Sequence, residues 1–135
     1  MALPIQKLRE IVFHLLYSHD FATLNEDAIP LLMQYHQVTK KSLYQAQNTV
    51  DQLIIHQEEI DQLIREHSTG YEFERIPRVE RNLLRLGIFE LKYVKDIPPK
   101  VAIHEAIRLA KKFATAESIQ FVNAVLDSVY KKHAV

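Results

Sequence analysis

The chain has 135 residues and a formal net charge of zero, with 17 basic and 17 acidic side chains. This length fits one domain that buries roughly two thirds of its unfolded surface, so folding requires neither a disulfide nor a metal ion. The absence of cysteine excludes disulfide, thiol and zinc-thiolate chemistry. Only two glycines leave few turns, which argues against sandwiches and barrels and predicts an all-α fold.

The charge is distributed unevenly along the chain. Residues 1–70 carry 5 basic and 9 acidic side chains, and residues 71–135 carry 12 and 8. A polyanion should therefore prefer the second half.

No apolar run approaches the roughly 20 residues that span a bilayer, so no membrane association is expected. His14 interrupts the apolar stretch REIVFHLLY, and no small-residue cleavage site follows it, so we expect a cytoplasmic protein.

The first predicted helix starts near Pro4 and carries an apolar stripe suited to a core. The stripe consists of Leu8, Ile11, Val12, Leu15 and Leu16. Phe13 and Tyr17 fall on the opposite face, which would be wet in a simple amphipathic helix. Either this helix is sandwiched between two halves of the domain, or these aromatic side chains bind a ligand.

After a connector from Ser18 to Asn25, a second helix is expected near Asp27, with Pro30 in its first turn, and it should end by about Gln37. Thr39 is suited to cap a third helix. The apolar stripe of this third helix changes phase further along, which predicts a break near His56 and a short helix from there to about His67.

A long helix is predicted from Pro77 to Val94, and the rest of the chain is organised around it. Its apolar residues cover most of the circumference, which is typical of a buried helix. The continuous polar arc holds Arg78, Arg81, Arg85 and Lys92, which predicts an exposed basic ridge. Glu80 and Glu90 fall on the apolar side, where each carboxylate needs a partner.

Two further helices follow the turn at Pro98 and Pro99. The first should run to about Phe113, with an outer strip that holds Lys100, His104, Arg108 and Lys111. Thr115 is suited to cap the last helix, on which Phe121 lies off the apolar stripe. The pattern as a whole predicts one domain over residues 1–135, with six to seven helices.

The sequence lacks the common catalytic and cofactor-binding motifs. His104-Glu105 begins like a metalloprotease motif, but Arg108 stands where the second metal ligand belongs. Two glycines cannot build a phosphate-binding loop. We therefore predict neither catalysis nor a cofactor or metal site.

What remains is binding chemistry, because basic helix faces with exposed aromatics contact phosphates and stack on unpaired bases. The alternative is that these charges only solubilise a helical domain.

Three segments resemble the NusB family of transcription antitermination factors. They are RVERNLLRLGIFEL, DIPPKVAIHEAIRLAKKF and ESIQFVNAVLD, and a weaker likeness continues through LREIVFHLLYSHDF and HQEEIDQLI. The resemblance implies an all-α fold of two small helical bundles, which would be subdomains of roughly residues 1–70 and 71–135, and no catalysis. It also implies binding of boxA-type RNA jointly with NusE, a ribosomal protein of the small subunit. The setting would be ribosomal RNA transcription, within an antitermination complex that contains RNA polymerase.

The beginning of the chain departs from the family pattern. NusB proteins usually start with an arginine-rich segment, whereas this chain offers only Lys7 and Arg9 there. Two milder departures are His104, where the family commonly has asparagine, and Ala124, where it commonly has glycine. The residues predicted to bind RNA are Lys7, Arg9, Tyr17, Arg81, Arg85, Lys100 and Lys111.

A second surface is predicted to bind the partner protein. It holds Glu80, Phe113, Glu117 and Phe121, because a phenylalanine off the core stripe beside carboxylates fits an apolar hot spot with a polar rim. The resemblance places NusE contacts there as well. The alternative is that Phe113 belongs to the core and Glu80 to a buried ion pair.

Two other functions remain open. The chain could be a module that self-associates through the same surfaces, as a homodimer, without binding RNA. NusB-like domains also precede ribosomal RNA cytosine methyltransferase domains, a function that would need a catalytic domain after residue 135.

Overall fold

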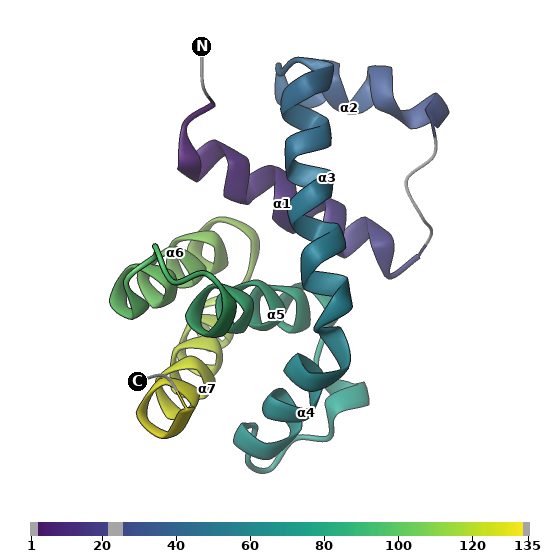
Figure 1. Cartoon of the computed structure of the whole chain (residues 1–135). Helices are drawn as coiled ribbons and strands as arrows, with labels where there is room; N and C mark the ends of the chain where they lie inside the picture. Colours follow the sequence, from purple (N-terminus) through teal and green to yellow (C-terminus); the bar gives the residue numbers. More distant parts are fainter. Residues whose placement is uncertain (1–2, 22–25, 134–135) are drawn as a thin grey trace. The chain divides into compact units, whose positions relative to one another are not determined.

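The computed structural model describes residues 3–21 and 26–133. Over these residues the chain forms seven α-helices, two short 3₁₀ turns and no strand, which confirms the predicted all-α fold (Figure 1). The helices are α1 (Ile5–His19), α2 (Ile29–His36), α3 (Lys40–Ile55), α4 (Gln57–His67), α5 (Arg78–Tyr93), α6 (Pro99–Phe113) and α7 (Ala116–His133). The 3₁₀ turns are η1 (Glu26–Ala28) and η2 (Phe73–Arg75). The expected connector from Ser18 to Asn25 lies partly outside the described residues.

The chain divides into two compact units, Met1–Ile54 and Ile55–Val135. The boundary comes earlier than the one expected near residue 70. The reason is that α4 packs on α5 and α7, so it belongs with the helices that follow it.

Several helix boundaries follow the local signals in the sequence, whereas α2 begins at Ile29, after a 3₁₀ turn that contains Asp27. The Thr39 hydroxyl accepts a hydrogen bond from the Ser42 backbone N–H at 3.1 Å, as expected of an N-cap of α3. Pro99 opens α6, where its missing N–H does no harm. The predicted break near His56 is confirmed, since α3 ends at Ile55 and α4 begins at Gln57.

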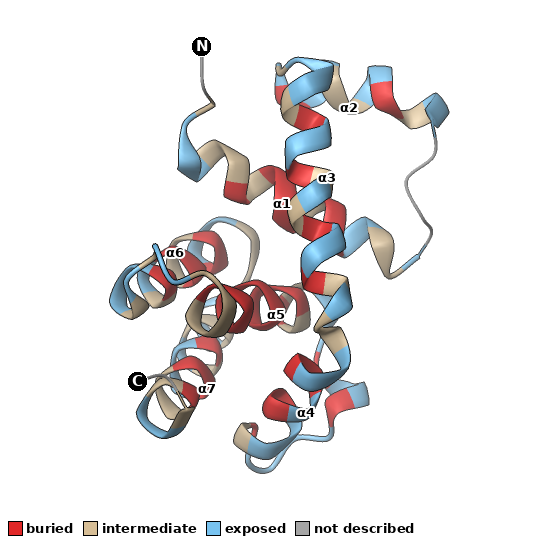
Figure 2. Ribbon diagram, in the orientation of Figure 1, coloured by how far each residue is buried: buried red, intermediate tan, exposed pale blue. Residues whose placement is uncertain are grey.

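Helix α5 forms the centre of the second unit, packed against α4, α6 and α7. Every residue from Asn82 to Glu90 is buried, as Figure 2 shows, which agrees with the prediction of an all-round apolar helix. Gly87 allows a close approach to α7, because a Cβ added there would lie 2.9 Å from both methyl carbons of Leu126. A larger residue at 87 would therefore require Leu126 or one of the two helices to shift.

In the first unit, four of the five residues of the predicted core stripe of α1 are buried, and Leu8 is half-buried. The four buried residues are Ile11, Val12, Leu15 and Leu16. Phe13 is also buried, whereas Tyr17 on the same nominally wet face is exposed. In the part of the chain that the structure describes, no helix is both long enough and apolar enough to cross a membrane.

Candidate nucleic-acid and partner interface

The start of α7 is tied to the start of α5 by a chain of short polar contacts. The Thr115 hydroxyl accepts a hydrogen bond from the Ser118 backbone N–H at 3.2 Å, which confirms the predicted N-cap. The Ser118 hydroxyl in turn donates to Glu80 Oε1 at 2.8 Å. Glu80 is 8% exposed. Its carboxylate therefore acts mainly inside the protein, where it positions the first turn of α7, and its partner is this hydroxyl rather than the cation of an ion pair.

An aromatic pair lies beside this contact. Phe121, one turn after Ser118, packs edge-on against Tyr71 with ring centroids 4.9 Å apart. Glu117, also one turn from Phe121 on the same face of α7, is exposed. We call Tyr71, Glu80, Glu117, Ser118 and Phe121 the α7-start patch. It gathers three of the four residues predicted to bind a partner, although Glu80 is buried beneath the surface.

Phe113, the fourth predicted partner residue, is the last residue of α6. It is half-buried, and the Lys112 ammonium lies 5.6 Å from the centre of its ring. Its position thus lies between the two predicted alternatives, a core residue and a surface contact.

The prediction of an exposed basic ridge on α5 is wrong for Arg81. Its Nη2 donates to the backbone carbonyls of Phe73, Glu74 and Ile76 at 3.0–3.1 Å. The guanidinium also lies over the Phe73 ring, 4.6 Å from its centroid. Arg81 therefore fastens the segment before α5 to the helix, and its charge is directed at carbonyls rather than at a ligand.

The prediction of an exposed ridge is also wrong for Arg85, which is only 4% exposed. Its Nε and Nη2 donate to the two carboxylate oxygens of Asp61 at 2.8 and 3.0 Å, and its Nη1 donates to Asn82 Oδ1 at 3.1 Å. This two-pronged geometry is the strongest form of an arginine–carboxylate pair. Arg85 thus links α5 to α4 inside the second unit and is not available to bind phosphate.

The candidate RNA residues of α1 differ in how much of each side chain is available. Lys7 is half-buried. Arg9 is only 5% exposed, so it does not offer the open phosphate contact that was predicted for it. Tyr17 is exposed and packs edge-on against Phe21, with centroids 5.4 Å apart. Phe21 is itself 64% exposed. Among the predicted residues, α1 therefore offers one lysine and one tyrosine ring, and Phe21 just after the helix adds a second ring.

Helix α6 keeps its predicted outer strip. Lys100 and Lys111 are both exposed. Eleven residues correspond to three helical turns, so the two ammonium groups leave the same face about 16 Å apart along the axis. Arg108 on the same helix directs its Nε to the Glu105 carboxylate at 3.1–3.2 Å, which offsets its charge. Lys100 and Lys111 are thus the cations of the prediction that are most accessible.

A histidine pair lies in the first unit. His36 is 3% exposed, and its Nε2 lies 3.3 Å from His14 Nδ1. Burial, aided by the nearby His14 and Lys7, lowers the pKa of His36 to about 4. His36 is therefore neutral at physiological pH and serves packing rather than phosphate binding.

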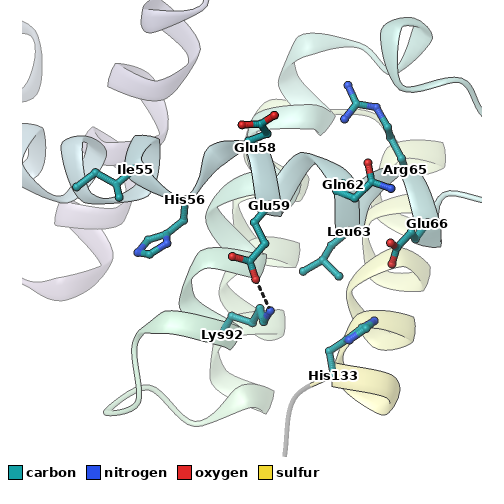
Figure 3. Close-up of a pocket in the computed structure, with 10 residues that line it drawn as sticks. All are labelled: Ile55, His56, Glu58, Glu59, Gln62, Leu63, Arg65, Glu66, Lys92 and His133. Atoms are coloured by element: carbon teal, nitrogen blue, oxygen red, sulfur yellow. Dashed lines mark hydrogen bonds and ion pairs between the residues drawn. The ribbon is translucent and has the colours of Figure 1, made fainter.

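The second unit also contains an open pocket of about 700 Å³ along α4 (Figure 3). At one side, Lys92 Nζ donates to Glu59 Oε1 at 2.8 Å, and this hydrogen bond lowers the pKa of the Glu59 carboxyl. His56 stacks on Tyr93 with centroids 3.9 Å apart. Burial raises the pKa of Tyr93 to about 12, and the neighbouring Glu59 carboxylate adds to the rise. These groups keep the end of α5 fixed against α4.

Three residues of these surfaces were not predicted from the sequence. Phe21 follows the end of α1 in an expected connector, and Tyr71 lies in the irregular segment before α5, so neither belongs to a helical stripe. Ser118 could have been noticed, because a serine three residues after the capping Thr115 can bond with it. Its contact with Glu80 joins residues 38 positions apart, which no local pattern reveals.

Together, the fold and these surfaces define an all-helical binding protein, with two accessible lysines on one helix face and an aromatic patch with an acidic rim. Comparison with known families shows which kind of helical binding protein this chain is. The NusB family model matches residues 6–131, so the chain belongs to the NusB family. This is a family of non-catalytic transcription antitermination factors, which confirms the prediction that the chain is not an enzyme.

Two relatives share much of this sequence, one of them along nearly the whole chain. Transcription antitermination protein NusB of Dehalococcoides mccartyi is 37% identical over 127 residues, which cover 93% of this chain and 89% of that protein. The Myxococcus xanthus protein of the same name is 52% identical over 84 residues, which cover 62% of this chain and 60% of that protein.

Solved structures of NusB proteins are also similar to this structure. NusB of T. maritima gives a TM-score of 0.82 at 35% identity, covering 100% of this chain and 96% of that one. A structure of the antitermination factors NusB and NusE in complex with double-stranded RNA gives a TM-score of 0.79 at 31% identity, covering 96% of this chain and 97% of the matched one.

Proposed function

We propose that this protein binds boxA-type RNA together with NusE during ribosomal RNA transcription in the cytoplasm, within an antitermination complex that contains RNA polymerase. The observation that carries the proposal is the likeness, over almost the full chain, to NusB in a structure that also contains NusE and RNA. Binding surfaces can differ between proteins of one fold, so the proposal also has to be supported by the side chains of this chain.

The α7-start patch is the surface that we propose for NusE. Phe121 is half-buried and keeps part of its ring open beside the exposed Glu117 and Tyr71. An aromatic anchor with a polar rim is the usual composition of an interface hot spot. Glu80 would contribute indirectly, because it holds Ser118 and thereby the first turn of α7.

For RNA we propose the accessible cations and rings. Lys100 and Lys111 would contact phosphates, with Lys7 as a third contact, and Tyr17 with Phe21 would stack on unpaired bases. Arg81 and Arg85 would support the fold of the second unit instead, because their guanidinium groups are engaged inside it. With so few accessible cations among the predicted residues, this chain alone should bind RNA weakly, and NusE would supply much of the remaining surface.

The partner proposal is tested by co-purification with NusE, with and without boxA RNA. Truncating a hot-spot aromatic typically costs about 2 kcal/mol or more, so Phe121→Ala should weaken NusE binding at least about 30-fold. Tyr44→Ala is the matched control, because Tyr44 is 40% exposed on α3, outside the proposed patch.

Two outcomes would contradict this assignment. Phe121→Ala could bind NusE as tightly as the parent, in which case the patch is not the partner surface. It could instead lower the melting temperature steeply, which would show that Phe121 serves the core. A parent protein that forms dimers and binds neither NusE nor RNA would favour the self-associating alternative.

A further inference from the structure

Two histidines and a glutamate converge where α4 and α7 end. Glu66 and His67 are the last two residues of α4, and His133 is the last residue of α7. One potential ligand atom from each, two imidazole nitrogens and a carboxylate oxygen, lies within 4.8 Å of the other two. Figure 3 shows Glu66 and His133 at the same end of the pocket, with the Glu66 carboxylate directed toward the His133 ring.

The two imidazoles already have the spacing of metal ligands. His133 Nε2 lies 3.1 Å from His67 Nε2. Two nitrogens that bind one zinc ion tetrahedrally, each at about 2.05 Å, are about 3.3 Å apart. The distance between the two nitrogens would therefore need to grow by only about 0.2 Å to admit the ion, with the rings turned so that both lone pairs point at it. Glu66 is exposed, so its side chain is free to turn toward the same point.

A hydrogen bond orients one of the rings. His67 Nδ1 lies 2.7 Å from the Ser128 hydroxyl. When Nδ1 carries the proton and donates it to Ser128, the Nε2 lone pair stays available. It can accept the hydrogen bond from His133 Nε2, or it can bind a metal ion once His133 Nε2 has given up its proton. Histidines that bind metals usually donate their other N–H to such a fixed group.

The backbone around the cluster favours a cation, because the carboxyl ends of two helices meet there. The carbonyl end of a helix carries partial negative charge, and the Glu66 carboxylate adds to it. One charge opposes binding, because Lys132 lies near enough to help lower the pKa of His67. Lys132 is exposed, so solvent screens most of this repulsion.

We propose that Glu66, His67 and His133 form a binding site for a divalent transition-metal ion, Zn²⁺ in the first instance, with the remaining position open to water from the pocket. Imidazole and carboxylate ligands suit zinc, and two histidines with one glutamate form a known ligand set for it. The bound ion ties the end of α7 to the end of α4 within the second unit. This role is independent of RNA or NusE binding.

The test is a titration of the full chain, prepared without a polyhistidine tag, with Zn²⁺ alone. Calorimetry should show one saturable site. At free Zn²⁺ about one hundred times the dissociation constant, the folding equilibrium constant should rise about 100-fold, seen as a higher melting temperature. His67→Gln and His133→Gln should each abolish the site. Ser128→Ala should weaken it about 10- to 100-fold, since it removes only the orienting hydrogen bond.

Two further variants separate a specific site from general histidine binding. His104→Gln is the matched control, because His104 is exposed on α6 and should leave zinc affinity unchanged. Glu66→Gln, at an exposed position that does not disturb packing, should weaken zinc binding even if a histidine variant folds poorly. The proposal is overturned if the parent shows no saturable site, or if Glu66→Gln and both histidine variants bind zinc as the parent does.

Discussion

Asp61→Ala should destabilise the protein far more than the removal of an ordinary ion pair. The substitution leaves the guanidinium of Arg85, which is 4% exposed, without the carboxylate that receives its 2.8 and 3.0 Å hydrogen bonds. Removing one partner of a buried pair costs about 3–5 kcal/mol, because the other charge remains buried without compensation. The free energy of unfolding of a typical protein is roughly 5–15 kcal/mol, so this loss is a large share of the total.

The measurement is urea denaturation followed by circular dichroism, with two companion variants. Asp127→Ala removes a pair with Lys131 whose side chains are 47% and 75% exposed, and it should cost at most about 0.5 kcal/mol. In the double variant Asp61→Leu, Arg85→Met, no buried charge is left unpaired, so much of the stability should be recovered. If Asp61→Ala costs no more than Asp127→Ala, the Asp61–Arg85 pair is not buried in solution, and Arg85 again becomes available as a surface cation.

Gly87→Ala should lower the free energy of unfolding, because overpacking against Leu126 costs about 1–3 kcal/mol while better helix propensity returns at most about 1. Higher stability in the same urea assay would show that Leu126 moves aside. The free energy of unfolding should also depend on the protonation of His36, whose pKa of about 4 in the folded protein lies below its ordinary 6.5. The unfolded chain binds the extra proton between these values, so this contribution is fully present above pH 6.5 and disappears as the pH falls toward 4. His36→Gln should flatten that part of the pH profile, and equal profiles for the variant and the parent would contradict the assignment. Finally, Lys100→Ala with Lys111→Ala should make the slope of log RNA affinity against log salt shallower by about 1.4, because each phosphate that a lysine neutralises adds about 0.7 to its steepness. An unchanged slope would exclude α6 from the RNA surface.

Most of the helices could be predicted from the sequence because their signals are local. The change of apolar phase near His56 marked the break between α3 and α4, and Thr39 and Thr115 marked two helix starts. The apolar circumference of the 77–94 segment identified the buried helix of the second unit. Each of these features depends on residues a few positions apart.

The site residues were harder to predict because their partners lie far away in the chain. Arg85 falls on the polar arc of its helix and looks solvated, but Asp61, 24 residues earlier, draws it into the protein. Helical periodicity records which residues share a face and not which other helix covers that face. The same limit applies to Glu80, because periodicity placed it on the apolar side, where it needs a partner, but did not show that this partner is Ser118, 38 positions further along the chain.

The central claim, that this chain binds boxA-type RNA together with NusE, is tested most directly by one fluorescence-anisotropy experiment. Labelled boxA RNA and a scrambled RNA of the same length are titrated with this protein alone, with NusE alone and with the two proteins mixed. We predict weak binding by this protein alone, and much tighter binding by the mixture, with boxA favoured over the scrambled RNA. A mixture that binds no more tightly than the better of the two separate proteins, or that binds both RNAs equally, would contradict the claim.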